Sequence, residues 1–347
     1  MNFSDIFARV VALTGGTALL MRRLTEGSHE PAWGSSPAIP VAKPQGSIPT
    51  LKMPTARGWT EGQTPVAAPG LTVNAYFLCR QYRWPGRLPL HGRCEPDYHA
   101  GTKARGVQAR RTLDAEPAAQ PRWAEALHRG RLVQQYRREW HVRRGRPSPI
   151  HEFDLASGQI RIFAGGLRHA VGMAWEPETG ALWTVVNERD GLGDETPPDY
   201  LTSVRDGGFY DWPYCYWGQT ADDRVPQDPA AVAKAITPDY ALGGHTASLG
   251  LCWLPAGTLP GFPDGMATGQ HGSWNRSKLS GYKVVFVPFA NGRPVGPPRD
   301  ILTGFLAPDE RVSYERPVGM TIDPDGSLLV ADDVGNVLWR VTGKRQR

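Results

Sequence analysis

The chain has 347 residues, enough for one large domain, and its 40 glycines and 32 prolines favour a fold made of many strands and turns. A formal charge of +5 would ordinarily suggest an acidic partner such as nucleic acid. Residues 76–147, however, hold 15 Arg and one Lys against six acidic residues, a net charge of +10, so all other residues together carry −5. The basic character belongs to one segment, and we expect no nucleic-acid partner.

The chain begins with a short apolar run at residues 10–21, which has arginines on both sides. It is shorter than the roughly 20 residues that a helix needs to cross a bilayer. We therefore expect residues 1–26 to be a degenerate export signal or anchor, with an arbitrary start as the alternative. Residues 27–70 are rich in Pro, Gly, Ser and Thr, which predicts an extended tether, and residues 71–74 resemble a first strand.

The basic segment shows no sustained strand alternation, although a weak helical pattern runs through residues 123–142. Three interpretations stay open for it: a basic insert that binds nucleic acid or membrane, a disordered insert, and an out-of-frame translation. Regular strand patterns return after Pro149, with a predicted hairpin at residues 150–155 and 159–163. The four cysteines have no metal-type spacing.

One pattern then occurs three times. Residues 168–187 and 316–332 each contain Arg, Val-Gly-Met, a turn with Pro and Gly, and a second apolar strand, and residues 248–255 form a looser copy. Each copy predicts a hairpin. The equivalent glycines Gly172, Gly250 and Gly319 are 78 and 69 residues apart. Repetition at this spacing in an all-β chain predicts a β-propeller. A further strand at residues 281–289, the Asn-Gly turn after it, and a closing strand at 336–341 complete the pattern.

Five segments carry a resemblance to a known family: Leu167–Pro177, Trp183–Asp190, Gly244–Gly250, Gly269–Arg276 and Arg316–Gly319. Together they resemble the sorbosone dehydrogenase branch of the glucose/sorbosone dehydrogenases, which are related to soluble quinoprotein glucose dehydrogenase. The resemblance covers residues 38–75 and 150–343. It implies a periplasmic six-bladed β-propeller at residues 71–343, with pyrroloquinoline quinone (PQQ) and calcium, that oxidises an aldose or aldehyde to the acid or lactone.

The resemblance also suggests an explanation for the irregular basic segment at residues 76–148. Relatives carry a Gly-Gly-His-Trp-Thr-Arg motif before the hairpin at residue 150. The resemblance implies that the His of this motif is the general base of the reaction. Leu113–Trp123 can be encoded by codons that, read one base over, give Trp-Thr-Arg-Ser-Leu-Leu-Pro-Ser-Pro-Asp-Gly, the stretch that follows Gly-Gly-His in relatives. The resemblance also implies an internal deletion after Asn74. We expect residues 76–148 to be an out-of-frame blade, which leaves the propeller incomplete. No catalytic residue is therefore identified, and we expect impaired activity.

PQQ is a flat tricarboxylate, so its pocket needs fixed cations, and arginine suits carboxylates because its planar fork donates two parallel hydrogen bonds. Arg168 and Arg316 occupy equivalent places in two repeats, and the resemblance implies that both face the cofactor. It adds Arg276, His245 and Trp274 as further contacts. The alternatives are exposed arginines at strand entries and a structural histidine and tryptophan. Relatives have Asn-Pro where this chain has His169 and Ala170, a departure beside Arg168.

The loop after residue 187 combines carboxylates with glycines, which suits an oxygen-seeking cation such as calcium. The resemblance implies that backbone carbonyls near Asp190 and Gly191 are the ligands, and an ordinary acidic loop is the alternative. Two other functions stay open for the chain as a whole: a calcium-dependent propeller lactonase and a non-catalytic propeller scaffold. The sequence identifies neither the sugar or aldehyde substrate nor the electron acceptor, and it allows membrane association only through the N-terminus.

Overall fold

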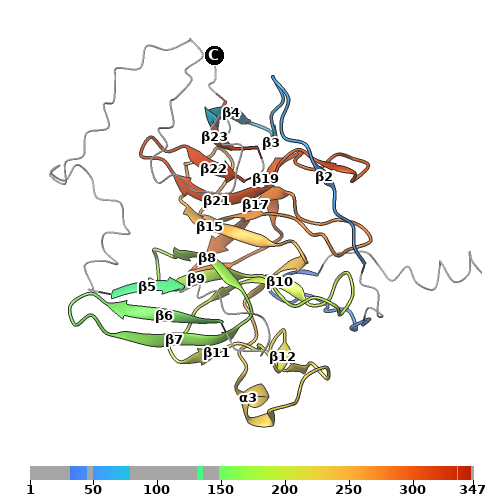
Figure 1. Ribbon diagram of the computed structural model, residues 1–347. Coiled ribbons are helices and arrows are strands. Elements are labelled where there is room, and N and C mark those ends of the chain that lie inside the picture. The colour runs from blue at the N-terminus through green and yellow to red at the C-terminus, as the bar shows by residue number, and fades with distance from the viewer. Residues whose placement is uncertain (1–31, 45–49, 79–130, 136–147, 334, 345–347) are drawn as a thin grey trace, which may run out of the picture. The chain divides into compact units, whose positions relative to one another are not determined.

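The structure, a computed structural model, describes residues 32–44, 50–78, 131–135, 148–333 and 335–344, which belong to one compact unit (Figure 1). This described part of the chain is almost entirely β, and its one α-helix is the short α3 (Pro229–Lys234). None of its helices is long and apolar enough to cross a membrane. The predicted export signal at residues 1–26 lies outside the described residues.

Four sheets follow one another along the chain. The first has the order β11-β7-β6-β5, from β5 (Arg131–Gln135), β6 (Ser148–Asp154), β7 (Ile160–Leu167) and β11 (Gly208–Phe209). The second has the order β1-β14-β10-β9-β8, from β1 (Trp33–Gly34), β8 (Ala170–Trp175), β9 (Leu182–Val186), β10 (Pro198–Ser203) and β14 (Tyr240–Gly244).

The third sheet has the order β15-β16-β17-β19-β3, from β3 (Val66–Ala67), β15 (Ser248–Leu254), β16 (Gly265–Gln270), β17 (Lys283–Ala290) and β19 (Arg299–Thr303), with β18 (Arg293–Pro294) on β17. The fourth has the order β21-β22-β23-β4, from β4 (Leu71–Leu78), β21 (Pro317–Ile322), β22 (Leu328–Asp332) and β23 (Val337–Gly343). Two small ladders pair β12 (Cys215–Tyr216) with β13 (Thr220–Ala221), and β2 (Thr55–Ala56) with β20 (Val312–Ser313).

The predicted hairpins are confirmed where a tight turn joins the strands. β6 pairs antiparallel with β7, β8 with β9, and β21 with β22. The looser copy at residue 248 differs, because its partner β16 begins only at Gly265. At the other extreme, Asn291 and Gly292 both have positive φ, +51° and +68°, which is the geometry of a two-residue turn that returns β17 to β18.

The repeated glycines lie where neighbouring sheets meet. β15 packs against β8 on one side and against β21 on the other (Figure 1). A Cβ atom on Gly172 would lie 2.6 Å from the Leu249 carbonyl oxygen, and one on Gly250 would lie 2.0 Å from that of Val318. The third glycine, Gly319, has no described heavy atom within 4 Å of such a position. Gly172 and Gly250 therefore allow the close approach of β8, β15 and β21.

Buried apolar clusters fill the spaces between successive sheets. Leu182 and Tyr200 of the second sheet pack with Ile150 and Leu167 of the first. Met266 and Val287 of the third sheet pack with Trp183 and Leu201 of the second, and the largest cluster joins the third sheet to the fourth. These face-to-face contacts explain why strands are buried on both faces, as β9 is along its whole length.

Several predicted elements differ from the structure or fall outside it. Residues 131–135 form strand β5, so the helical pattern predicted for this stretch is wrong there. Residues 79–130 and 136–147, which make up most of the basic segment, lie outside the described part of the chain. The tether at residues 27–70 contains three two-residue strands, β1, β2 and β3, that pair with strands of the later chain.

Candidate functional site

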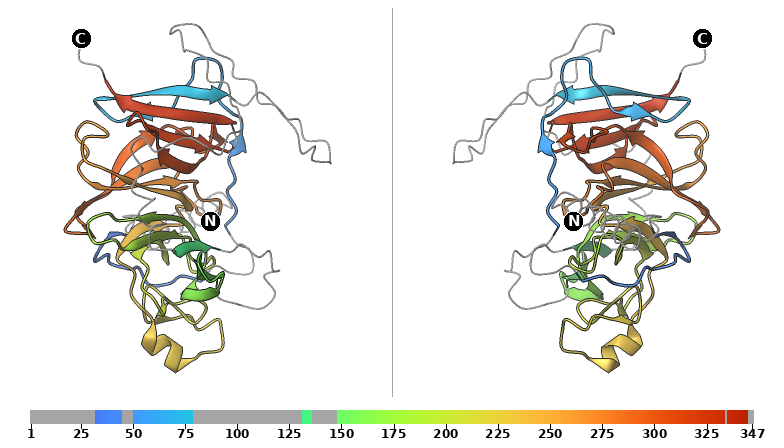
Figure 2. Two further views of the ribbon diagram at one scale, coloured as in Figure 1. Left: turned by 90° about the vertical axis from the view of Figure 1, so that its left-hand side faces the viewer. Right: turned by 90° about the vertical axis from the view of Figure 1, so that its right-hand side faces the viewer.

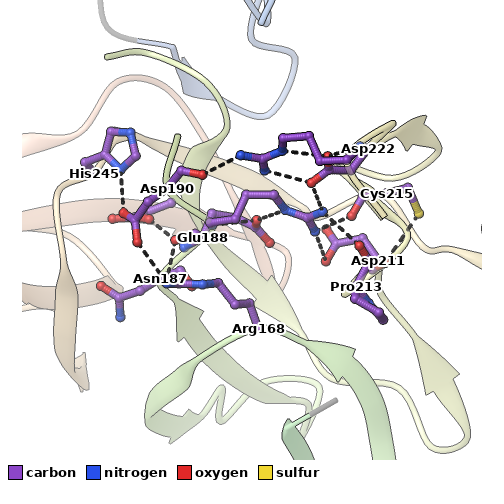
Figure 3. Close-up of polar contacts among 12 residues, drawn as sticks. Arg168, Asn187, Glu188, Asp190, Asp211, Pro213, Cys215, Asp222 and His245 are labelled. Carbon is purple, nitrogen blue, oxygen red and sulfur yellow. Dashed lines mark hydrogen bonds and ion pairs between the residues drawn. The ribbon is translucent and has the colours of Figure 1, made fainter. Parts of the chain in front are cut away.

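Arg168 lies between β7 and β8 and extends toward the loop that follows β9. Its Nη1 donates to the carbonyl oxygen of Glu188 at 2.6 Å, and its Nη2 donates to Oδ2 of Asp190 at 3.1 Å (Figure 3). The side chain is 28% exposed. One predicted cofactor residue is thus fixed by the predicted metal loop and still reaches solvent.

Asp199 of β10 joins this loop to the turn after β14. One of its oxygens accepts the backbone N–H of Glu188 at 2.8 Å, and the other accepts the N–H of Ala247 at 2.7 Å. In this turn His245 and Ala247 have φ of +53° and +51°, left-handed values that are uncommon for residues other than glycine. The buried carboxylate therefore stabilises a strained turn directly beside the loop.

The oxygens of Asp190 all accept hydrogen bonds from side chains. Asn275 Nδ2 donates to Oδ1 at 2.7 Å, Arg168 donates to Oδ2, and Arg224 Nη1 donates to the carbonyl oxygen at 2.9 Å. Gly191 follows with φ of +86°, and a Cβ atom there would lie 2.9 Å from Arg224 Nη1. Glycine at this position leaves room for the guanidinium group.

This arrangement does not fit a calcium ion. Calcium takes six to eight oxygen ligands, whereas the Asp190 oxygens here face nitrogen donors, two of them cationic. Among the residues that the structure describes, no group of three or more His, Cys, Asp and Glu side chains is placed to hold a metal. The metal assignment of Asp190 and Gly191 stays a prediction from the resemblance.

An open cavity of about 300 Å³ lies beside Asp190. Three arginines and one tryptophan supply its cationic and aromatic lining, and the lining residues are Arg168, Arg189, Asp190, Trp212, Asp222, Arg224 and Val225. The guanidinium carbons of Arg189 and Arg168 lie 4.9 and 6.0 Å from the centroid of the Trp212 ring. Arg189 is buried, whereas Arg168 and Arg224 are 28% and 35% exposed and give the cavity a positive charge that suits an anionic ligand.

A buried charge cluster supports the floor of this cavity. Arg189 donates to Glu188 at 3.0 Å and to Asp222 at 2.9 Å, and its Nη2 lies 3.9 Å from Asp211. Burial alone lowers the pKa of Arg189, but the charges of Glu188 and Asp211 raise it above its ordinary value. For Asp222, hydrogen bonds from Arg224 and Arg189 outweigh burial and lower the pKa to about 2. Arg189 and Asp222 therefore form a charged pair.

Asp211 is the exception in this cluster. It is fully buried, and neither of its carboxyl oxygens has a hydrogen-bond partner. Burial first, and the neighbouring charge of Glu188 second, raise its pKa well above the ordinary value. The hydroxyl of Tyr200 and Oε1 of Glu188 also lack partners. Burial therefore disfavours the charged form of Asp211 in the floor of the cavity.

His245 joins the Asp190 site. It is buried, its Nε2 lies 2.9 Å from the Gly193 carbonyl oxygen, and its Nδ1 lies 3.6 Å from Oδ1 of Asp190 (Figure 3). Asn275, which connects His245 to Asp190, was not singled out from the sequence, although it lies in the motif that contains Trp274 and Arg276. Arg224 and Asp222 were also missed, because they lie in a polar passage with no copy elsewhere in the chain.

The remaining predicted residues lie outside the cavity lining. All three side-chain nitrogens of Arg276 are engaged, by an ion pair with Glu195 and by the carbonyl oxygens of Gly244 and Lys278. Trp274 is 42% exposed. Their assignment as cofactor contacts stays a prediction.

Arg316 belongs to a second polar cluster. It donates to the Tyr282 hydroxyl at 2.6 Å and lies 3.3 Å from Nδ1 of His271. The other ring nitrogen of His271 lies 2.8 Å from Oδ2 of Asp333. The backbone connects this cluster to the first one, because His271 N donates to the Ala247 carbonyl in the turn that contains His245.

Comparison with known proteins supports the resemblance found in the sequence. The model of the TrAA12-like family matches residues 216–344. An uncharacterized protein of Borreliella burgdorferi is 30% identical over 195 residues, which are 55% of this chain and 51% of that protein. The chain thus spans about half the length of this curated relative.

Solved structures are similar over a comparable share. A Carbohydrate-Active Enzymes Family AA12 protein of Trichoderma reesei is 23% identical, with a TM-score of 0.48 over 56% of this chain and 59% of that one. The pyranose dehydrogenase PQQ domain of Coprinopsis cinerea is 23% identical, with a TM-score of 0.44 over 56% and 61%. The soluble aldose sugar dehydrogenase of Escherichia coli is 19% identical, with a TM-score of 0.40 over 56% and 55%. The TrAA12-like match lies almost wholly within residues 150–343, the larger of the two parts of the chain that carry the predicted resemblance.

Proposed function

We propose that this chain is a PQQ-dependent dehydrogenase of sugars or aldehydes, exported to the periplasm, in which the four described sheets are blades of a six-bladed propeller. The match of residues 216–344 to the TrAA12-like family supports the reaction class. Named relatives include a pyranose dehydrogenase with a PQQ domain and an aldose sugar dehydrogenase. The electron acceptor and the particular sugar are outside this proposal.

The observation that carries the proposal is the cavity beside Asp190. Arg168, which the repeat pattern selected, lines it together with Arg224 and Trp212. The partly exposed guanidinium group of Arg168 can donate further hydrogen bonds to a carboxylate, Arg224 adds positive charge although its nitrogens are engaged with Asp222 and Asp190, and the indole offers a flat surface for an aromatic ring system. These residues therefore fit a flat polycarboxylate such as PQQ. When bound, PQQ would accept the hydride that leaves the substrate carbon.

The described residues would bind and orient the ligands. Arg168 and Arg224 would neutralise the carboxylates of the cofactor, and Trp212 would cover one face of it. Oxidation of a hydroxyl group also needs a base for its proton. In relatives, the expected base is the His of a Gly-Gly-His-Trp-Thr-Arg motif. This motif is missing from the sequence. We therefore propose that the chain binds the cofactor and turns over substrate poorly.

Titration of PQQ into the purified full-length chain, followed by quenching of tryptophan fluorescence, tests the binding step. We expect saturable quenching, and Arg168→Ala should weaken binding by roughly 10- to 100-fold, because a charge-assisted hydrogen bond contributes about 1.5–3 kcal/mol. Arg293→Ala is the matched control, since Arg293 is 58% exposed, pairs with Asp239 and does not line the cavity.

Two outcomes would contradict parts of the proposal. A folded chain that shows no saturable PQQ binding would reject the cofactor, and hydrolysis of lactones without quinone would favour the lactonase instead. Rapid PQQ-dependent dye reduction with an aldose or aldehyde would reject the predicted impairment while leaving the reaction class in place.

A further inference from the structure

Arg224 approaches the Asp190 turn from a distant part of the chain and is held rigidly. Its Nε and Nη2 donate to the two carboxylate oxygens of Asp222, each at 2.8 Å, which fixes the plane of the guanidinium group. The remaining nitrogen, Nη1, donates to the Asp190 carbonyl oxygen at 2.9 Å. Asp222 is itself held by Arg189. The positive charge at the Asp190 carbonyl oxygen is therefore supplied by the guanidinium group of Arg224.

The oxygens of Asp190 already face nitrogen donors. Arg168 and Asn275 donate to the two carboxylate oxygens. A divalent ion on the carbonyl oxygen would lie next to two guanidinium charges, and repulsion between charges a few ångströms apart is large at a partly buried site. Gly191 is the residue that allows this approach, because a side chain there would meet Arg224 Nη1 at 2.9 Å.

We propose that Arg224 takes the place of a divalent cation at the Asp190–Gly191 turn, so that the cavity binds a carboxylate-bearing anion without a metal ion. The metal-free character follows from the contacts of Arg224 alone. The identity of the anion as a quinone cofactor rests on the proposed function. The two parts can therefore fail separately.

Terbium luminescence on the full-length chain without cofactor tests the metal part, because terbium substitutes for calcium and is sensitised by nearby tryptophan, here Trp212. The wild-type chain should show no saturable, calcium-displaceable emission, and its thermal midpoint should be the same with calcium and with chelator. Arg224→Ala should gain saturable, calcium-displaceable emission, at least about tenfold tighter than any residual binding by the wild type, because a neighbouring positive charge is removed. Arg293→Ala should behave as wild type.

Arg224→Lys separates charge from shape. Lysine retains the positive charge, so this variant should stay without metal, whereas the neutral Arg224→Gln should gain calcium binding and replaces Arg224→Ala if the latter does not fold. Saturable calcium binding by the wild type that is lost in Asp190→Asn would overturn the proposal. The proposal also fails if no folded neutral variant gains calcium binding. A PQQ titration with chelator present tests the cofactor independently. If no quinone binding is seen, the proposed function is rejected, but the conclusion about metal binding is unaffected.

Discussion

The backbone of Gly250 lies directly against the carbonyl oxygen of Val318, where a Cβ atom would come within 2.0 Å. Gly250→Ala should therefore push β15 away from β21 and lower the free energy of unfolding by about 1–3 kcal/mol, as overpacking does in close-packed interiors. Urea denaturation followed by circular dichroism measures this.

Gly319→Ala is the matched control, because it occupies the equivalent place in the repeat and has no described heavy atom within 4 Å of the added methyl group. It should leave stability within about 0.5 kcal/mol of wild type or raise it slightly. Equal destabilisation by both substitutions would show that the close approach at Gly250 is not the cause.

Asp211→Asn should stabilise the protein. The asparagine removes a buried carboxyl group whose oxygens have no hydrogen-bond partner, and its amide can donate to the unpaired Oε1 of Glu188. An unsatisfied buried polar group costs about 1–3 kcal/mol, so the gain should be of that size. Asp222→Asn, which breaks two ion pairs in the same cluster, should destabilise by about 3 kcal/mol. Destabilisation by both variants would contradict this distinction.

Stability should fall with rising pH because of Glu315. Burial first, then the neighbouring Asp332, raise its pKa to about 9, so the folded chain keeps a proton that the unfolded chain loses near pH 4.5. The contribution is zero below pH 4.5, and it then reduces stability by at most about 1.4 kcal/mol per pH unit until pH 9. Glu315→Gln should flatten this part of the curve, measured by urea denaturation at several pH values. An unchanged slope would contradict the assignment.

Arg276→Ala should destabilise the chain by about 3–5 kcal/mol, because it leaves the carboxylate of Glu195, 11% exposed, without its partner. Lys283→Ala breaks an exposed pair with Asp300 and should cost less than about 1 kcal/mol. Thermal unfolding distinguishes the two. If Arg276→Ala is as stable as wild type but fails to quench with PQQ, Arg276 contacts the cofactor as the sequence predicted.

The sequence predicted the hairpins well, because a period of two and turns with Pro or Gly depend on neighbours in the chain. It missed β1, β2 and β3, which are too short to show a pattern and form because a later strand offers its edge. For the site, the repeat identified Arg168, and the loop composition identified Asp190. The sequence did not predict Arg224, because nothing in its own segment indicates a hydrogen bond to the Asp190 carbonyl oxygen, 34 residues earlier.

The pairing of β4 with β23 has a consequence for synthesis of the protein. Leu71 lies opposite Gly343 and Val73 opposite Val341, so the last sheet joins two segments about 270 residues apart (Figure 2). The ribosome makes β4 first and reaches β23 only about 270 residues later. For most of that time β4 has no partner strand. The partners of β1, β2 and β3, which are β14, β20 and β19, are also made later in the chain. The N-terminal strands of the described fold therefore depend on slow, non-local contacts with strands that are made later.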